Sequence, residues 1–317
     1  MRSKILIIAG PTAAGKTKYA AALAKTLNGE ILSADSMQIY KYMDIGSAKP
    51  SLEELSTVPH HLIGEADPMD EWSAALYQRE AKQRINQILL RGKLPVVVGG
   101  TGLYINSLLY EMDFADSGAN EDLRKELQYL AENKGGQALH DRLKKADPLS
   151  AERIHPNNVK RLIRAIEVAE NGEKGIPPLS GSLEKNRDYD PVLIGLGLKR
   201  EVLYDRIEKR VDAMMDAGLL DEVSGLLERG LTKDHNSMKG IGYKEIAGFI
   251  NGEYGIDEAV KQIKQNTRNY AKRQITWFRR YEDMKWFDLT NVDFDQSLTE
   301  ITEYIRSKLY THSEQGG

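Results

Sequence analysis

The segment 10–17 contains the residues whose types and spacing best suit chemistry, because together they can bind phosphate groups. It matches the pattern G-x-x-x-x-G-K-[ST] at every fixed position and reads Gly10, Pro11, Thr12, Ala13, Ala14, Gly15, Lys16 and Thr17. Glycines let the backbone curve so that N–H groups point inward, and a following helix N-terminus adds partial positive charge. We expect this segment to bind a diphosphate or triphosphate, with Lys16 on the phosphate oxygens and Thr17 on Mg²⁺. A chance glycine turn is the weaker interpretation, because an apolar run precedes the segment and a helix-like stretch follows it.

Asp35 and Thr101 are the next candidate chemical groups, since each follows a short run that predicts a strand. The two runs are residues 30–34 and 94–98. In an open α/β sheet, ligands bind beyond the carboxyl ends of the strands, so we expect both side chains in the same cleft as the segment 10–17. Asp35 would act as a general base or a metal partner, and capping a helix is the alternative role for both residues.

The residues that follow the run 94–98 also narrow the class of enzyme. Nucleotide hydrolases usually place an acidic residue after a second apolar strand, where it holds Mg²⁺ or aligns water. Here that place is taken by Gly99, Gly100, Thr101 and Gly102. The sequence therefore favours a small-molecule transferase, in which Asp35 does chemistry, over a motor protein or a GTPase.

Residues 261–280 form a predicted helix, the basic stripe, with seven basic residues and no acidic residue. One helical face carries Lys261, Lys264, Arg268, Lys272 and Arg279. On another face Ile263, Tyr270 and Trp277 recur every seven residues and are expected to pack inward. A row of like charges is unfavourable unless a polyanion neutralises it, so the stripe predicts a contact with an RNA backbone. Pairing with acidic residues elsewhere in the chain is an equally good interpretation.

Two smaller basic clusters lie outside the stripe. The first comprises Lys160, Arg161 and Arg164, and separate basic clusters favour an extended anion over a small ligand. The second comprises Arg206 and Arg210, which are one helical turn apart, and one of them could bind a leaving phosphate group. Pairing with acidic neighbours on the same helix is a serious alternative for this second cluster.

An α/β fold must position these groups. Runs that predict strands, at 4–9, 30–34, 94–98 and 192–198, alternate with helix-like stretches at 16–27, 72–90 and 201–228. This order predicts a mainly parallel sheet flanked by helices. Residues 122–168 are polar and helix-like, and residues 171–191 show neither the hydrophobic periodicity of a helix nor that of a strand. We therefore expect a core made of 1–113 and 192–310, a helical insertion domain at 114–191 and a disordered tail at 311–317.

Composition and charge exclude several other classes. The chain has 317 residues, no cysteine and a formal net charge of −3. The absence of cysteine excludes disulfides, thiolate nucleophiles and cysteine-ligated metal centres. No stretch approaches the roughly 20 apolar residues of a membrane span, and the first apolar run is too short for a signal peptide. We expect a cytoplasmic monomer that would hold any polyanion through local basic patches.

The chain resembles the bacterial tRNA dimethylallyltransferases, which are isopentenyltransferases that modify an adenine beside the anticodon. The resemblance rests on stretches that span almost the whole chain in family order. They are GPTAAGKT at 10–17, SADSMQIY at 33–40, DIGSAKP at 44–50, VPHHLI at 58–63, VVVGGTGLY at 96–104, ERIHPNNVKRLIRAIEV at 152–168, RIEKRVDAM at 206–214, KGIGYKE at 239–245 and TRNYAKRQITWFRR at 267–280.

The resemblance implies a P-loop core with a helical insertion that clasps the anticodon arm. It implies transfer of a dimethylallyl group from dimethylallyl diphosphate to the exocyclic N6 of that adenine, with Mg²⁺. Asp35 would then serve as the base. Lys16, Arg210 and Mg²⁺ on Thr17 would stabilise the leaving diphosphate, which the segment 10–17, Arg206 and Arg210 would bind.

The resemblance also implies which residues contact tRNA. Asp35, Ser36, Met37 and Gln38 would read a flipped-out adenine, with Thr101 beside them. The anticodon arm would contact Arg124, Val159, Lys160, Arg161, Leu162 and Ile163, together with Lys264, Arg268 and Lys272 of the basic stripe. Three alternatives remain open at this point: a P-loop small-molecule kinase, an isopentenyltransferase acting on free adenine nucleotide, and a non-catalytic RNA-binding protein.

Overall fold

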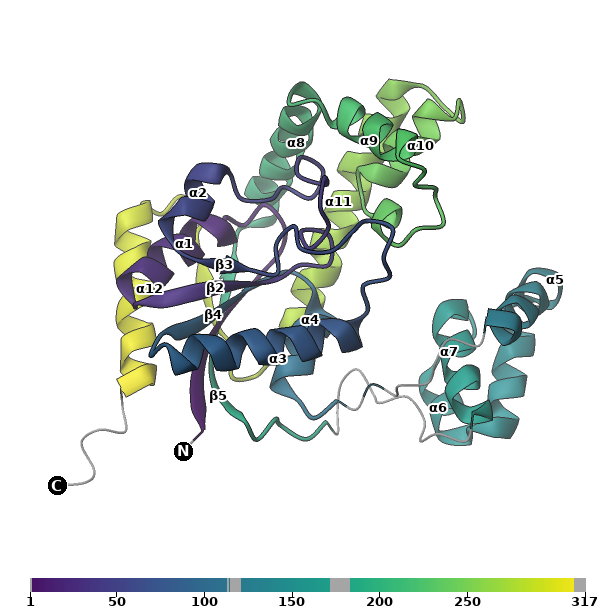
Figure 1. Ribbon diagram of the computed structural model, residues 1–317, viewed down its shortest axis with the longest axis horizontal. Helices are drawn as coiled ribbons and strands as arrows, with labels where there is room; N and C mark the ends of the chain where they lie inside the picture. Colours follow the sequence, from purple (N-terminus) through teal and green to yellow (C-terminus); the bar gives the residue numbers. More distant parts are fainter. Residues whose placement is uncertain (1, 113, 115–120, 172–182, 311–317) are drawn as a thin grey trace. The chain divides into compact units, whose positions relative to one another are not determined.

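A computed structural model describes residues 2–112, 114, 121–171 and 183–310 (Figure 1). At its centre is a six-stranded sheet in the order β3-β2-β4-β1-β5-β6, and every pair of neighbouring strands is parallel. The strands are β1 (Ser3–Ala9), β2 (Gly29–Ala34), β3 (His60–His61), β4 (Leu94–Gly99), β5 (Tyr189–Gly197) and β6 (Lys285–Asp288). The predicted α/β fold with a mainly parallel sheet is confirmed.

The central strand β1 is buried on both faces, as its continuous apolar run predicts. Ile7 pairs with Val97 of β4 on one side and with Leu193 of β5 on the other. Leu6 and Ile8 point into a core that also contains side chains of helices α1 (Lys16–Thr26) and α12 (Phe294–Tyr310). These two helices contact each other and cover one face of the sheet (Figure 1). Helices α3 (Ala74–Leu90) and α4 (Gly102–Leu109) pack on the strands from the other side.

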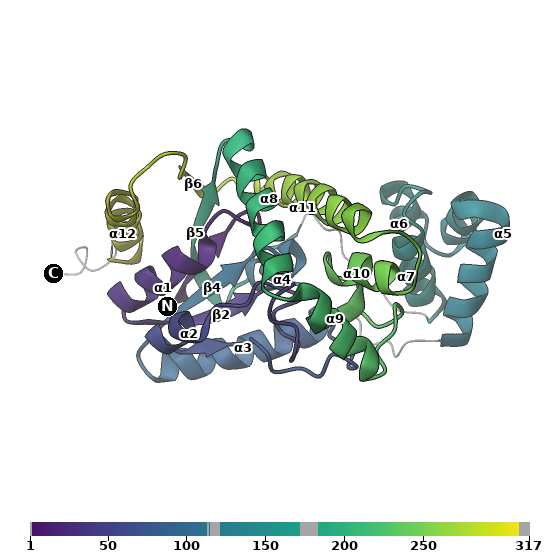
Figure 2. The same ribbon diagram turned by 90° about the horizontal axis from the view of Figure 1, so that it is seen from above.

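A second group of helices follows β5 in the same compact unit. Helices α8 (Arg200–Asp216) and α11 (Ile256–Phe278) lie side by side (Figure 2). The stretch expected to be helical over 201–228 is broken at Gly218, whose left-handed φ of 97° separates α8 from α9. The remaining helices of this unit are α2 (Leu52–Thr57), α9 (Leu219–Glu228), the 3₁₀ turn η1 (Ser237–Lys239) and α10 (Tyr243–Ile250).

Residues 110–185 form a separate compact unit, and residues 1–109 with 186–317 form the unit that contains the sheet. The smaller unit consists of α5 (Glu121–Ala146), α6 (Pro148–Arg153) and α7 (Val159–Glu170), and α5 is bent at Gly135. These helices enclose an apolar core of their own that includes Leu127, Leu139 and Leu162.

The boundary of this helical unit differs from the expected insertion at 114–191. Strand β5 begins at Tyr189 rather than at residue 192, because Tyr189, Asp190 and Pro191 pair with the first residues of β1. Residues 172–182 of the expected insertion and the expected disordered tail at 311–317 lie outside the described residues. Within the described part of the chain, no helix is long and apolar enough to cross a membrane.

Candidate active site

The phosphate-binding loop connects β1 to α1 at the carboxyl edge of the sheet. Gly10 has no space for a side chain, because a Cβ atom there would lie 2.4 Å from the carbonyl oxygen of Leu196 in β5. Ala13 and Gly15 have left-handed φ angles of 62° and 87°, which turn the chain into the helix. No side chain caps the N-terminus of α1, so the N–H groups of its first turn are available to an anion.

Lys16 begins helix α1 and points back over the loop. Its Nζ atom donates a hydrogen bond to the carbonyl oxygen of Pro11 at 2.8 Å. Burial lowers the pKa of this ammonium group to about 8, the Asp35 carboxylate acts in the opposite direction, and the Arg210 guanidinium lowers it further. Lys16 and Asp35, which follow β1 and β2 at the carboxyl edge of the sheet, therefore share one electrostatic site with Arg210 of α8.

Asp35 follows β2 and has a structural contact as well as an electrostatic one. Its Oδ1 atom accepts hydrogen bonds from the backbone N–H groups of Met37 at 2.8 Å and Gln38 at 3.3 Å. These bonds stabilise a turn over residues 36–39, and no helix begins there, so Asp35 does not cap a helix as the alternative interpretation of the sequence expected. No donor within the described residues bonds to Oδ2, so this oxygen is left to accept a proton.

Arg210 and Arg206 have different surroundings although both lie on α8. Burial lowers the pKa of Arg210, and the nearby Asp35 carboxylate raises it. Arg206, one turn earlier on the same helix, is exposed. The sequence could not separate these two candidates, and the structure brings Arg210 but not Arg206 to the phosphate-binding loop.

Thr101 lies between β4 and α4 and contacts the turn after Asp35. Its Oγ1 atom accepts a hydrogen bond from the backbone N–H of Ser36 at 3.0 Å. Tyr270 of α11 interacts with both Asp35 and Thr101. Burial raises the pKa of Tyr270 and the Asp35 charge raises it further, whereas a hydrogen bond with Thr101 lowers it. Tyr270 is thus a site residue that the sequence assigned only to inward packing.

Gln274, one helical turn beyond Tyr270, was not identified from the sequence. Its Oε1 atom accepts a hydrogen bond from the Thr12 backbone N–H at 2.8 Å, and its Nε2 atom donates to the carbonyl oxygen of Gly100 at 2.9 Å. A Cβ atom on Gly100 would lie 2.0 Å from Nε2, which explains the glycine there. The Thr12 N–H is therefore occupied by protein rather than free for phosphate.

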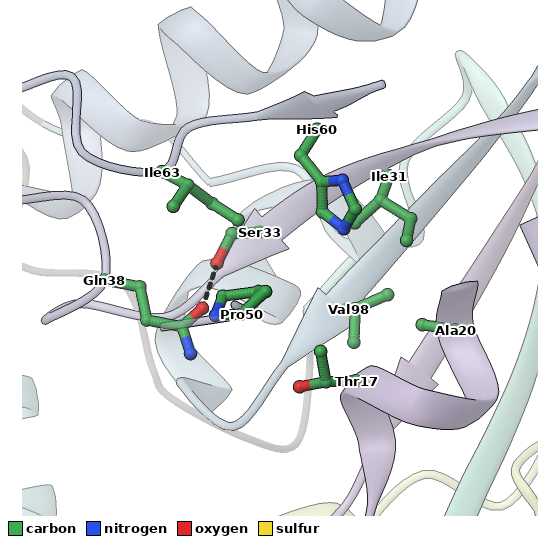
Figure 3. Close-up of a pocket in the computed structure, with 9 residues that line it drawn as sticks. All are labelled: Thr17, Ala20, Ile31, Ser33, Gln38, Pro50, His60, Ile63 and Val98. Carbon is green, nitrogen blue, oxygen red and sulfur yellow. Dashed lines mark hydrogen bonds between the residues drawn. The ribbon is translucent and has the colours of Figure 1, made fainter. Parts of the chain in front are cut away.

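Thr17 lines a small cavity between α1 and strands β2, β3 and β4 (Figure 3). Its volume is about 20 Å³, which is enough for a water molecule. Ser33 Oγ donates to Gln38 Oε1 at 3.2 Å on one wall. On another wall, His60 Nδ1 donates to the carbonyl oxygen of Val58 at 2.7 Å, so Nε2 carries the lone pair, and it has no partner among the described residues.

The donor set around Thr17 fits Mg²⁺ bound partly through a substrate. Its hydroxyl group makes no hydrogen bond within the described part of the chain, and hydroxyl, carboxylate and phosphate oxygens are the ligands Mg²⁺ prefers. The described residues contain no group of three or more histidine or acidic side chains that could hold a metal ion alone. Phosphate oxygens would have to complete the coordination.

Gln38 is already engaged by the protein. Its Nε2 atom donates to the carbonyl oxygen of Ala48 at 3.1 Å, and its Oε1 atom accepts from Ser33. Direct base reading by this side chain, which the resemblance implied, would require these bonds to be exchanged. Ser36 and Met37 lie in the same turn, where the Ser36 N–H is bonded to Thr101.

The basic stripe is paired more fully than its sequence indicated. Lys264 Nζ lies 2.6 Å from Asp212 Oδ1, and Arg268 Nη1 lies 2.6 Å from Glu208 Oε1. Both acids belong to α8, so for these two residues the structure shows the pairing with acidic residues elsewhere in the chain that the sequence left open as an alternative. Lys272 is exposed and forms no ion pair within the part of the chain that the structure describes.

The proposed tRNA-contacting residues of the helical unit also divide into two groups. Arg124 Nε and Arg164 Nη1 each lie 2.9 Å from the carboxylate of Glu167, which is fully buried, so both arginines neutralise an internal charge. Leu162 is fully buried in the core of this unit, and its side chain does not reach the surface. Lys160 is exposed, whereas burial lowers the pKa of Arg161.

This geometry defines a class of protein: a P-loop transferase with one carboxylate opposite the cations of the phosphate site. A family model described as IPP transferase matches residues 38–281, and one described as isopentenyl transferase matches residues 3–69. The chain therefore belongs to the IPP transferase family of enzymes.

Curated relatives and solved structures agree with this assignment. The tRNA dimethylallyltransferase of Alkaliphilus oremlandii is 52% identical, with 95% of this chain and 96% of the relative covered. That of Clostridioides difficile is 50% identical, with 96% and 98% covered. The crystal structure of the tRNA isopentenylpyrophosphate transferase from Bacillus halodurans has a TM-score of 0.74 at 46% identity, with 97% of both chains covered. A eukaryotic dimethylallyltransferase acting on tRNA has a TM-score of 0.80 at 28% identity, with 98% of this chain and 80% of that chain covered.

Proposed function

We propose that the protein transfers a dimethylallyl group from dimethylallyl diphosphate to N6 of the adenine on the 3′ side of the anticodon in tRNA. The observation that carries the proposal is the position of Asp35, whose charge acts on both Lys16 and Arg210. A base and two cations then face one reacting centre. The relatives named above are tRNA dimethylallyltransferases, which supports the choice of substrates. A tRNA substrate also supports a cytoplasmic location.

Binding of the diphosphate would use the phosphate-binding loop. The free N–H groups at the start of α1 and the ammonium group of Lys16 would contact its oxygens, with Lys16 exchanging the Pro11 carbonyl for phosphate. Arg210 would add a second cation on the α8 side. Mg²⁺ held by Thr17 and phosphate oxygens would neutralise charge on the leaving diphosphate.

Transfer would form a bond between N6 and the allylic C1 carbon while the bond from C1 to the diphosphate oxygen breaks. The bonding electrons of that C–O bond leave with the diphosphate, whose charge Lys16 and Arg210 stabilise. The lone pair of an exocyclic adenine amine is conjugated with the ring, so the amine must lose a proton as the new bond forms. That proton would go to Oδ2 of Asp35, which no donor among the described residues occupies.

The acceptor adenine must leave its base stack to reach this site, which costs least in a single-stranded loop. Thr101 and Tyr270 lie beside Asp35 and would border the flipped base. Lys272 on α11 and Lys160 on α7 are exposed cations that would contact the RNA backbone.

The test is incubation with labelled dimethylallyl diphosphate and unmodified tRNA, followed by nucleoside analysis. We expect label in N6-dimethylallyladenosine from tRNA, no label on free AMP, and loss of transfer when Mg²⁺ is chelated. Labelled AMP with unlabelled tRNA would instead identify an isopentenyltransferase of free nucleotides. Binding of tRNA without consumption of the diphosphate would contradict an enzymatic role.

A further inference from the structure

Glu222, in the first turn of α9, forms hydrogen bonds with the loop 44–48, which lies far from it in the sequence. Its carboxylate accepts hydrogen bonds from three successive backbone N–H groups, those of Asp44 at 2.8 Å, Ile45 at 2.7 Å and Gly46 at 3.0 Å. A carboxylate held by several backbone N–H groups makes charge-assisted bonds, which are stronger than bonds between neutral groups. The loop 44–48 is therefore fixed to α9.

Tyr243, the first residue of α10, forms hydrogen bonds with both Glu222 and the same loop. Its hydroxyl group donates to Glu222 Oε1 at 2.8 Å and accepts from the Ser47 N–H at 3.0 Å. The Tyr243 side chain is fully buried, and a Cβ atom on Gly46 would lie 2.7 Å from its ring. Two sequence motifs without an assigned role, DIGSAKP at 44–50 and KGIGYKE at 239–245, thus meet at this point.

The loop 44–48 also contacts the turn 35–38. Gln38 Nε2 donates to the carbonyl oxygen of Ala48 at 3.1 Å. Gly240, in the second motif, lies against Met37, because a Cβ atom there would lie 2.5 Å from Met37 Cε. The turn 35–38 is therefore supported twice, through the loop 44–48 and directly by Gly240. All these residues belong to the unit that contains the sheet.

We propose that Glu222 and Tyr243 are positioning residues that set the turn 35–38 for the acceptor adenine by holding the loop 44–48. This inference rests on the proposed function, in which that turn receives the base. Neither side chain is bonded to the phosphate-binding loop in the described residues. Their loss should therefore impair use of tRNA and leave use of dimethylallyl diphosphate unchanged.

The test compares Glu222→Gln and Tyr243→Phe with the wild-type protein. An amide at position 222 would present an NH₂ group to backbone donors, and phenylalanine at 243 removes both hydroxyl bonds without changing the ring. We expect kcat/KM for tRNA to fall by about tenfold or more, with KM for dimethylallyl diphosphate within about twofold of wild type. Glu228→Gln, an exposed carboxylate on the same helix, and Tyr254→Phe, which removes a hydroxyl bond to the Glu245 carbonyl, are matched controls.

The outcomes separate the inference from the function on which it rests. If the wild type modifies tRNA but both variants match their controls in kcat/KM for tRNA, the positioning role is wrong and the proposed function stands. An equal loss for both substrates, in proportion to a lowered melting temperature, would also reject it, since that pattern indicates general destabilisation. If the wild type does not modify tRNA at all, both proposals fail together.

Discussion

Gln274 in helix α11 accepts a hydrogen bond from the backbone N–H of Thr12 in the phosphate-binding loop, over a distance of 2.8 Å. The same side chain donates to the Gly100 carbonyl oxygen at 2.9 Å. One buried amide group therefore joins the loops that follow β1 and β4, and both bonds come from the helix that carries the basic stripe. The phosphate site and this helix are coupled by direct contact.

Gln274→Leu should leave one donor and one acceptor unpaired in a buried place. We expect the free energy of unfolding to fall by about 2 kcal/mol or more, since each unpaired buried group costs roughly 1–3 kcal/mol. Use of dimethylallyl diphosphate should weaken as well, because the phosphate-binding loop loses its support. Urea unfolding and KM for the diphosphate measure the two effects. Gln262→Leu, on the same helix with a bond to Glu258, is the control, and equal behaviour of the two variants would reject the coupling.

Asp35→Asn should abolish transfer while binding of tRNA and diphosphate persists. Asparagine can still accept the bonds from Met37 and Gln38, so the turn is preserved, but it cannot take the proton from N6. Removal of a general base typically costs 10²–10⁴-fold in rate. Single-turnover assays measure the loss, and Asp67→Asn, which removes an equivalent carboxylate bonded to the Met69 N–H, is the control. Retention of more than about a tenth of the activity would rule out Asp35 as the base.

Arg210→Gln and Arg206→Gln should differ sharply although the two residues are one helical turn apart. Arg210 shares a site with Lys16 and Asp35, so its loss should lower kcat by about 10²-fold, as for other groups that stabilise developing charge. Arg206 is exposed, and we expect its variant to remain near wild type. Steady-state kinetics with saturating tRNA compare them. Equal losses would place both arginines on the diphosphate.

Lys272→Ala should weaken the binding of tRNA whatever the nucleotide sequence of the tRNA. It should also lower the slope of log affinity against log salt concentration by about 0.7–0.9. Lys264→Ala should change this slope less, because Asp212 already neutralises Lys264 at 2.6 Å. Filter binding or fluorescence anisotropy over a range of salt concentrations measures both slopes. Parallel, superimposed lines for wild type and Lys272→Ala would mean that the stripe is a solvated face.

Glu30→Gln should destabilise the protein at pH 7 but not in acid. Glu30 bonds Arg91 through both carboxylate oxygens, at 3.0 and 2.6 Å, and also contacts His61, and the hydrogen bond with Arg91 is the largest cause of its lowered pKa. Folding lowers the pKa of this carboxyl group, so the charged form stabilises the fold at pH values above the ordinary pKa of 4.5. This stabilisation is lost as the pH falls from 4.5 through the lowered pKa.

We therefore expect a loss of about 1–2 kcal/mol at pH 7 for Glu30→Gln that narrows below about pH 4.5. Urea unfolding at several pH values measures this difference, with Glu53→Gln, an exposed carboxylate in α2, as the control. A destabilisation that does not change with pH would show that packing, rather than charge, is what the substitution removes.

The fold class and the phosphate-binding loop could be predicted from the sequence because both depend on local patterns. The runs Ile5–Ala9 in β1 and Leu94–Val98 in β4 are continuously apolar, and a parallel sheet buries such strands on both faces. The place of Asp35 and Thr101 followed from the same reasoning, since carboxyl ends of parallel strands meet at one edge. The beginning of β5 was missed, because Asp190 and Pro191 lack a strand pattern and are held there by pairing with β1.

The sequence by itself determined the phosphate-binding loop, the parallel sheet and the carboxylate beside it, since each depends on residues close together in the chain. Only the tertiary structure decided which of Arg206 and Arg210 faces Asp35, that Asp212 and Glu208 neutralise part of the basic stripe, and that Gln274 and Glu222 hold distant loops. These contacts join residues that are distant in sequence, and the periodicity of one helix does not reveal which other helix packs against it. The physical reason is that ion pairs and buried hydrogen bonds depend on the approach of two surfaces, whereas strands, helices and tight turns depend mainly on local backbone geometry and burial pattern.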